Sequence, residues 1–251
     1  MRAVILAAGL GWRLGGGEDQ LPKCLLEFDG RSLLHRHLDA LHAVGITQVT
    51  IGVGYRADAI EKELSKVVAG MTVDVVFNAD FHEGNVVTLY TLRAAMTAGD
   101  DVMLMDADVL YHVDLLSRLA GSEHRNCFLM DRNFEAGDEP VKLCVSSNRL
   151  VEFGKQIAAD VAYDTVGESV GFFKLSSKMA SRLVWRAEEY VLQGRRDAFY
   201  EDALRDLLLA CSAEFGCEDI TGIPWIEIDF QQDIRRAETE VLAHIRARVA
   251  A

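Results

Sequence analysis

The sequence has few of the residues that separate independently folded domains. Its 251 residues include only three prolines, and no stretch is rich in glycine and serine or low in complexity. Flexible and extended linkers are typically built from those residues. We therefore expect residues 1–251 to form one domain, and this length is sufficient to bury a substantial core.

Long apolar runs and paired cysteines are also missing. No run approaches the ~18 apolar residues that a membrane-spanning helix needs, and the apolar stretch near the N-terminus is too short for a signal peptide. The five cysteines are scattered without a Cys-x-x-Cys pair, which argues against a zinc cluster and against a disulfide framework. We expect a protein of the reducing cytoplasm that does not span a membrane.

The chain has no excess of positive charge. Its formal net charge is -13, whereas proteins that bind nucleic acids present a basic face to the phosphates. A nucleic-acid partner is therefore not expected. An anionic small substrate is compatible with this charge if a few cations are focused in one cleft.

What the sequence does contain is an alternation of strand-like and helix-like segments. In the first half, apolar runs predict strands at 2–8, 48–55, 72–78 and 101–111. Segments with helical periodicity separate them at 31–44, 57–68 and 85–98. This order predicts an α/β fold: one Rossmann-like, mostly parallel mixed sheet with helices on both faces.

The second half is richer in strands and predicts a small β-rich subregion. Strands are expected at 126–132, 141–147, 150–156, 168–176 and 224–230. Helices are expected at 177–193, at 200–213 and from Gln232 onward.

The first predicted strand ends in a glycine-rich loop that carries two cations. Glycines occupy positions 9, 11, 15, 16 and 17, Arg13 lies among them, and Pro22-Lys23 follows. The loop lies beyond the carboxyl end of a strand, where open α/β sheets bind ligands. Glycine lets backbone N–H groups approach phosphate oxygens, and Arg13 and Lys23 suit phosphates. The spacing matches neither the Rossmann fingerprint nor a P-loop, so a merely flexible loop is the open alternative.

Acidic residues follow two other predicted strands. Asp106 and Asp108 end the strand at 101–111 on one side of its pleat, and Glu227 and Asp229 share a face of the strand at 224–230. Nucleotidyl transfer needs a divalent ion to neutralise the polyphosphate, and Mg²⁺ prefers carboxylate oxygens. For each acid, a solvated carboxylate at a strand end is the alternative.

The stretch Leu6-Ala7-Ala8-Gly9-x-Gly11-x-Arg13, followed by Pro22-Lys23, resembles the N-terminal signature of the nucleotidyltransferases that make nucleoside-diphosphate sugars and alcohols. The resemblance implies a GT-A-like nucleotidyltransferase fold in which residues 1–111 bind the nucleotide and residues 112–251 bind the acceptor. Gly15–Gly17 departs from the family, where many relatives carry bulkier residues around a proline. We expect this loop to be mobile before nucleotide binds.

Within that superfamily the chain looks most similar to the phosphocholine, phosphonate and inositol-phosphate cytidylyltransferases. The segments "FNADFHEGNVVTLYTLRAA", "VEFGKQI" and "FYEDALRDLL" carry this likeness. The implied nucleotide-binding residues are Leu6, Ala8, Gly9, Gly11, Arg13, Lys23, Asn85, Thr88 and Asp106. The implied acceptor-binding residues are Lys155, Glu168, Tyr200, Glu201, Asp202 and Glu227. The implied ligands of Mg²⁺ are Asp108 and Asp229.

The resemblance implies transfer of CMP from CTP to a small phosphorylated alcohol or phosphonate, with release of pyrophosphate. Arg13 and Lys23 are the expected catalytic cations, the first on the β- and γ-phosphates and the second on the α-phosphate. The acceptor oxygen is already anionic, so no protein nucleophile is needed. Acids facing the acceptor suit a cationic head group or polyol hydroxyls.

Three other functions stay open at this point. A sugar-1-phosphate uridylyl-, guanylyl- or thymidylyltransferase shares the N-terminal signature. A glycosyltransferase also uses an Asp-x-Asp motif, which Asp106-Ala107-Asp108 fits. A regulator that binds nucleotide without turnover is the third. The sequence does not determine the oligomeric state, and a homodimer is compatible with it.

Overall fold

The first apolar run forms the central strand of a mixed sheet. The computed structural model describes residues 1–15, 20–65, 70–135 and 137–249. Gly16 and Gly17 of the loop expected to be mobile, and residues 66–68 of a predicted helix, lie outside them. Strand β1 (Arg2–Ala7) pairs in parallel with β4 (Gln48–Val53) on one edge and with β6 (Val102–Asp106) on the other. Strand β5 (Thr72–Phe77) extends the parallel part beyond β4.

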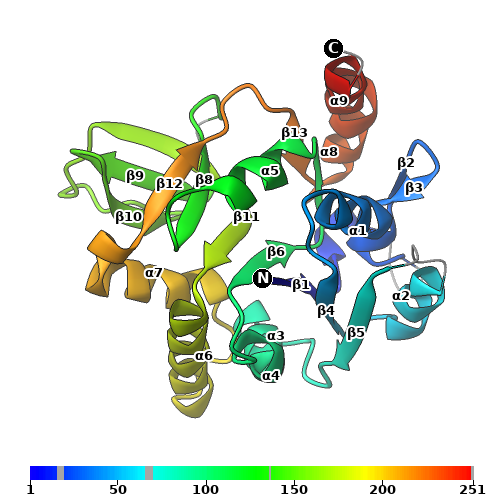
Figure 1. The fold of residues 1–251 in the computed structure, drawn as a ribbon, viewed down its shortest axis with the longest axis horizontal. Helices are drawn as coiled ribbons and strands as arrows, with labels where there is room; N and C mark the ends of the chain where they lie inside the picture. The colour runs from blue at the N-terminus through cyan, green and yellow to red at the C-terminus, as the bar shows by residue number, and fades with distance from the viewer. Residues whose placement is uncertain (16–19, 66–69, 136, 250–251) are drawn as a thin grey trace.

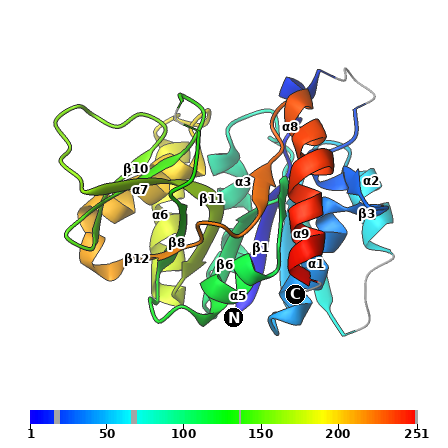
Figure 2. The same ribbon diagram turned by 90° about the horizontal axis from the view of Figure 1, so that it is seen from above.

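The predicted β-rich subregion joins the parallel strands through one long strand (Figures 1 and 2). Strand β11 (Thr165–Leu175) pairs antiparallel with β6 through its last residues and with β9 through its first residues. The remaining strands of this sheet are β8 (Cys127–Asp131), β9 (Lys142–Ser146), β10 (Arg149–Gly154) and β12 (Gly216–Asp219). The order β10-β9-β11-β6-β1-β4-β5, with β8 paired to β11 and β12 paired to β8, confirms the mostly parallel mixed sheet.

Helices cover both faces of the sheet, as the alternation along β1 requires. Ala3 and Ile5 belong to one buried cluster, which includes residues of α1 (Leu33–Ala43), α2 (Ala57–Leu64) and α5 (Asp114–Gly121). Val4 and Leu6 belong to the cluster on the other face. The helices of that face are α3 (Asn85–Thr91), α4 (Arg93–Met96), α6 (Ser177–Leu192) and α7 (Tyr200–Ala210).

Several predicted elements are shorter or divided. The run at 101–111 was expected to be one strand, but it bends after Asp106, and its second part forms β7 (Val109–Tyr111). Strand β7 leaves the main sheet and pairs antiparallel with β13 (Trp225–Glu227). The predicted helix at 85–98 divides at Leu92 into α3 and α4. Helix α5 and strand β12 were not predicted.

The C-terminal segment packs beside the β7–β13 ribbon. Helix α8 (Gln231–Arg236), the π-helical turn Ala237–Val241 and α9 (Leu242–Val249) form a third buried cluster with residues of that ribbon. The short hairpin of β2 (Glu27–Phe28) and β3 (Arg31–Ser32) precedes α1. A 3₁₀ turn, Ser212–Glu214, precedes β12. Within the described residues, no helix has both the length and the apolar character needed to cross a membrane.

Candidate active site

A cleft of about 950 Å³ lies beyond the carboxyl ends of β1 and β6 and is lined by residues from both halves of the chain. Open α/β sheets bind their ligands at this edge. The predicted residues that line the cleft are Leu6, Ala8, Gly9, Gly11, Arg13, Lys23, Asn85, Thr88, Asp106, Asp108, Lys155, Glu201, Asp202, Glu227 and Asp229. Glu168 and Tyr200 are not among the lining residues.

Leu14 anchors the glycine-rich loop in the core, and Gly11 shapes the loop backbone. A 3₁₀ turn, Trp12–Leu14, follows Gly11, and Leu14 is buried in the third cluster. Gly11 has a φ of +62°, a conformation that L side chains rarely adopt, and a Cβ there would lie 3.1 Å from Cγ of Lys23. Glycine at this position therefore leaves room for the Lys23 side chain.

Lys23 projects into the cleft because its neighbours are held in the core. It begins the 3₁₀ turn Lys23–Leu25, in which Cys24 and Leu25 are buried. Its Nζ donates to Oδ2 of Asp108 at 2.9 Å and to Oδ1 of Asp229 at 2.6 Å. Burial alone lowers the pKa of an ammonium, but these two carboxylates outweigh it and raise the pKa of Lys23 above its ordinary value. Lys23 is therefore a charged group between two acids.

The β7–β13 ribbon brings the two acids together. Glu227 pairs with Val109, and the next rung continues as a hydrogen bond from the Ile228 N–H to the Asp108 carbonyl at 2.9 Å. Asp108 and Asp229 therefore meet although 121 residues separate them in sequence. Single carboxylate oxygens of Asp108, Glu227 and Asp229 lie within 4.8 Å of one another. A set of three carboxylates fits a hard divalent cation, which prefers oxygen ligands.

A buried histidine holds the bend that carries Asp108. The two ring nitrogens of His37 lie 3.1 Å from the Ala107 carbonyl and 3.1 Å from the Tyr111 hydroxyl. Burial lowers the pKa of His37 to about 4. A neutral imidazole thus ties α1 to both sides of the bend.

Arg13 and Lys155 line the cleft and share one carboxylate. Arg13 donates to Asp229 at 3.3 Å and to Glu139 at 3.4 Å, and Lys155 donates to the same Glu139 oxygen at 3.1 Å. Glu139 thereby links a cation of the glycine-rich loop with a cation that follows β10. The sequence did not indicate Glu139, because it lies in a loop without a recognisable motif.

Buried acids and Tyr200 form a network that joins α3, β6 and α7. The side-chain Oδ1 of Asn85 accepts the Tyr200 backbone N–H at 2.7 Å, and the Tyr200 hydroxyl donates to Asp106 at 2.8 Å. Burial, with the charges of Glu201 and Asp108, raises the pKa of Asp106 well above its ordinary value. Burial also raises the pKa of Glu201 to about 7. Tyr200 is fully buried and contacts the cleft lining through Asp106, so its predicted role in binding the acceptor remains a prediction.

Glu168, the other predicted residue outside the lining, lies on the opposite side of its strand, and its role in binding the acceptor remains a prediction. On β11, Ser169, Gly171 and Phe173 line the cleft, and the pleat directs Glu168 to the other side of the strand. There its register partner on the neighbouring strand β8 is Asp131. Burial, together with the negative charge of Asp131, raises the pKa of Glu168 to about 7. Both faces of β11 are largely buried, so the sequence alone could not show which face is turned to the cleft.

Arg205 lines the cleft but was missed. Its guanidinium forms two hydrogen bonds, at 2.7 and 2.6 Å, with the buried carboxylate of Glu152. A signal was available, because Arg205 lies one helical turn after Glu201 on the same predicted helix.

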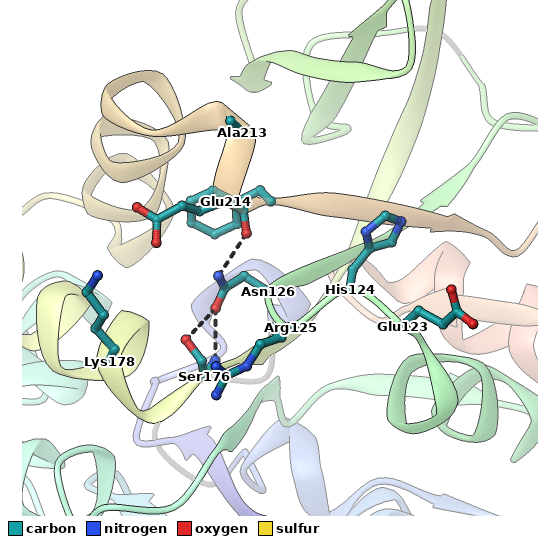
Figure 3. Close-up of a pocket in the computed structure, with 9 residues that line it drawn as sticks. Glu123, His124, Arg125, Asn126, Ser176, Lys178, Ala213 and Glu214 are labelled. Atoms are coloured by element: carbon teal, nitrogen blue, oxygen red, sulfur yellow. Dashed lines mark hydrogen bonds between the residues drawn. The ribbon is translucent and has the colours of Figure 1, made fainter.

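A second, smaller hollow of about 410 Å³ lies where the N-terminus of α6 meets β12 (Figure 3). Asn126 occupies its centre, donates to the Glu214 carbonyl at 2.8 Å and accepts from Ser176 at 2.9 Å. None of the predicted site residues lines this hollow.

Comparison with known proteins gives the same family as the N-terminal motif. The family model of the MobA-like NTP transferase domain matches residues 3–168. The chain is 28% identical to CMP-5'-(3-aminopropyl)phosphonate synthase of Streptomyces rubellomurinus, over 95% of this chain and 38% of that protein. It is 25% identical to CTP:phosphoglutamine cytidylyltransferase of Campylobacter jejuni, over 93% of this chain and 98% of that protein.

The chain thus spans nearly all of the second relative but only about two fifths of the first. Solved structures agree on the fold. The inositol-1-phosphate CTP transferase of T. maritima superposes with a TM-score of 0.75 at 23% identity, over 98% of this chain and 96% of that one. The CTP:phosphocholine cytidylyltransferase of Streptococcus pneumoniae gives 0.71 at 21% identity, over 94% of this chain and 97% of that one. The chain belongs to the family of MobA-like NTP transferase domains.

Proposed function

We propose that this protein transfers CMP from CTP to a small phosphorylated alcohol or phosphonate and releases pyrophosphate. One observation carries the proposal: Arg13 and Lys23 of the glycine-rich loop lie in one cleft within hydrogen-bond distance of Asp229 and Asp108. A polyphosphate needs cations, and a metal that accompanies it needs carboxylates. The named relatives that act with CTP or form CMP conjugates support the choice of nucleotide.

The cations of the chain orient the triphosphate in this proposal. Arg13 holds the β- and γ-phosphates, and Lys23 turns from the carboxylates to the α-phosphate as negative charge develops there. An anionic acceptor oxygen needs no protein base, so the enzyme acts by positioning and by neutralising charge. The backbone of Leu6, Ala8, Gly9 and Gly11, with Asn85, Thr88 and Asp106, surrounds the nucleotide.

Nucleotidyltransferases of this family generally use a divalent metal ion. We propose that Asp108 and Asp229 hold Mg²⁺ here, with Glu227 beside them. The bound ion supplies charge neutralisation to the polyphosphate. The Lys23 ammonium contacts the same two carboxylates, so it contributes positive charge at the proposed metal site.

The acceptor half supports an acceptor with a cationic or hydroxyl-bearing end. Lys155 is suited to the acceptor phosphate or phosphonate, because it lies close to Arg13: both cations contact the same oxygen of Glu139. Glu201 and Asp202 line the same half, and carboxylates bind ammonium groups and hydroxyls. Residues 1–111 as nucleotide half and 112–251 as acceptor half are part of this proposal. A cytoplasmic location and a homodimer are further predictions, to be checked by fractionation and sedimentation.

A crossed assay tests the function. Pyrophosphate release is measured with ATP, CTP, GTP and UTP, each against phosphocholine, 3-aminopropylphosphonate, inositol 1-phosphate and a sugar 1-phosphate. We expect Mg²⁺-dependent release with CTP and one of the first three acceptors. Release only with the sugar phosphate would replace the proposal by a sugar-1-phosphate nucleotidyltransferase. Nucleotide binding without any turnover would favour a regulator, and turnover only of a nucleotide sugar would favour a glycosyltransferase.

A further inference from the structure

Helix α1 joins the two segments of the chain that carry Lys23 and Asp108. Its first residue, Leu33, donates its backbone N–H to the Leu26 carbonyl at 3.0 Å, directly after the turn that begins with Lys23. Residues of this turn and of α1 also belong to one buried cluster. One helical turn after Leu33, the side chain of His37 reaches the bend that precedes Asp108. The same helix therefore contacts the segments on both sides of the 2.9 Å contact between Lys23 and Asp108.

The contacts of His37 determine which of its ring nitrogens carries the proton. Burial lowers the pKa of His37 to about 4, so the ring is neutral near pH 7 and has one N–H. The Ala107 carbonyl can only accept a hydrogen bond, so Nε2, which lies 3.1 Å away, is the donor. Nδ1 then accepts from the Tyr111 hydroxyl, also at 3.1 Å. Each ring nitrogen thus has a partner of matching hydrogen-bonding character.

Neighbouring aromatic rings enclose the imidazole. His37 is 0% exposed. Its ring centroid lies 5.3 Å from that of Tyr111 and 5.9 Å from that of Phe172, which is nearly perpendicular to it. Phe172 belongs to β11 and is the register partner of Met105 on β6. A turn of the imidazole would break both of its hydrogen bonds in a place where their loss is costly.

The two peptide units that flank Asp108 are both hydrogen-bonded. The unit before it contains the Ala107 carbonyl, which His37 holds. The unit after it contains the Asp108 carbonyl, which accepts the Ile228 N–H at 2.9 Å. Because each peptide unit is planar, the orientation of one unit relative to the other sets φ and ψ of Asp108. His37 and Ile228 together therefore fix the direction in which the Asp108 side chain leaves the backbone.

We propose that His37 is a positioning residue for the metal site: through the Ala107 carbonyl it sets the place of the Asp108 carboxylate beside Asp229. This inference rests on the proposed function, because it takes Asp108 as a metal ligand. His37 is not among the residues that line the cleft, so its effect on the metal is exerted through the backbone. Loss of a group that orients a ligand from outside the coordination shell typically lowers metal affinity or activity about 10- to 100-fold.

Two variants separate the hydrogen bond of His37 from the burial of its ring. The amide nitrogen of glutamine reaches as far as Nε2 does, so His37→Gln can still donate to the Ala107 carbonyl. Asparagine is one bond shorter and reaches only as far as Nδ1, so His37→Asn leaves that carbonyl without its donor. The matched control is Asn126→Ala, which removes a buried amide that donates to the Glu214 carbonyl at 2.8 Å, outside the large cleft.

Three measurements are made on each variant. Electron paramagnetic resonance gives the Kd for Mn²⁺ alone, pyrophosphate release gives kcat, and a crystal structure gives the distance from Lys23 Nζ to Asp108 Oδ2. For His37→Asn we expect the Kd to rise and kcat to fall about tenfold, and the distance to exceed 2.9 Å. His37→Gln should stay close to the wild type in all three. Asn126→Ala should lower the melting temperature and leave all three unchanged.

Tyr111→Phe keeps the test decisive if His37→Asn does not fold. This variant removes the hydroxyl that donates to Nδ1 of His37 and changes the volume of the side chain very little. Since His37 then keeps only one of its two hydrogen bonds, we expect the Kd for Mn²⁺ to rise about threefold.

An unchanged Kd for Mn²⁺ in His37→Asn and in Tyr111→Phe would overturn the inference. Equal losses in His37→Gln and His37→Asn would also overturn it, because the packing of the ring and not its hydrogen bond would then matter. So would an Asp108 carboxylate that keeps its place in the crystal structure of His37→Asn. If the wild type releases no pyrophosphate with any nucleotide, the proposed function fails, and the Mn²⁺ binding and the crystal structures still decide on His37.

Discussion

Lys23 makes the shortest contacts between the glycine-rich loop and the acids. Its ammonium lies 2.6 Å from Asp229 and 2.9 Å from Asp108, and its side chain is only 14% exposed. We expect Lys23→Ala to lower kcat about 10²- to 10³-fold, because the lost cation acts on charge that develops in the transition state. The KM for CTP should change much less. Initial rates of pyrophosphate release at saturating Mg²⁺ provide both constants.

A matched variant for this experiment is Lys178→Ala, which removes an exposed lysine from α6 outside the large cleft. It should leave both constants unchanged. If Lys23→Ala raised KM as strongly as it lowered kcat, Lys23 would hold the ground state as firmly as the transition state, contrary to the role proposed here.

At the same scale, the sequence shows which residues carry charge but not which way they face. Arg13, Lys23, Asp108 and Asp229 could be nominated because glycine spacing and strand ends are local features. The face of β11 that lines the cleft could not be assigned from the sequence, because the residues on both sides of the strand are largely buried. Glu168 was therefore placed in the cleft, whereas its neighbour Ser169 lines it.

At the scale of elements, Glu139 lies between β8 and β9 in the sequence and lines the cleft. The Glu139 carboxylate accepts from Arg13 and Lys155, the two cations that we propose bind the substrate phosphates. We expect Glu139→Gln to lower the KM for CTP and for the acceptor about two- to threefold at low ionic strength, since the competing charge is lost. The difference should fade as salt is added, because both contacts are exposed.

The control for that loop is Glu135→Gln. Glu135 is exposed and faces Arg236 rather than the two cations, at 3.6 Å. It should not change either KM. A KM for CTP that rises in Glu139→Gln would mean that Glu139 helps to position Arg13 instead of competing with the phosphates.

The bend of β11 depends on a single glycine. At Gly171 an alanine Cβ would meet the Asp106 carboxylate, and the φ of +77° costs an L side chain about 1–2 kcal/mol. We expect Gly171→Ala to destabilise the protein by at least that amount and to lower kcat, because Asp106 and the Tyr200 hydroxyl that bonds it must move. Urea unfolding and pyrophosphate release measure the two effects.

Gly121→Ala is the comparison for this substitution. Gly121 ends α5 without a positive φ, and a Cβ there would meet no atom within 4 Å. Alanine should be tolerated or slightly stabilising at that site. Equal unfolding midpoints for the two variants would show that β11 can relax around Gly171.

Elements were predicted well where periodicity is strong, and poorly where a tertiary contact ends them. The strand at 101–111 is apolar throughout, but the chain bends after Asp106 so that β7 can pair with β13. That pairing depends on residues more than a hundred positions away. The sequence placed the acids at a strand end correctly, yet the antiparallel rung that brings Asp108 beside Ile228 is visible only in the fold.

At the scale of the whole molecule, folding buries acids on both sides of the sheet. Their burial should make the free energy of unfolding depend on pH. Glu168 lies on the side of β11 away from the cleft. Burial and the neighbouring Asp131 raise its pKa to about 7, from an ordinary value near 4.5. The folded state therefore holds this proton more tightly than the unfolded state does between these two values. In that window the free energy of unfolding falls as the pH rises.

We accordingly expect Glu168→Gln to stabilise the protein above pH 7 by about 1–2 kcal/mol, after allowance for partial exposure. Near pH 4 the carboxyl is protonated in both states, so the variant and the wild type should be alike. Urea unfolding from pH 4 to pH 8 measures the difference, with Glu61→Gln, an exposed acid of α2, as the control. A Glu168→Gln advantage that is the same at every pH would show that Glu168 remains ionised in the folded protein, with its proton lost well below pH 7.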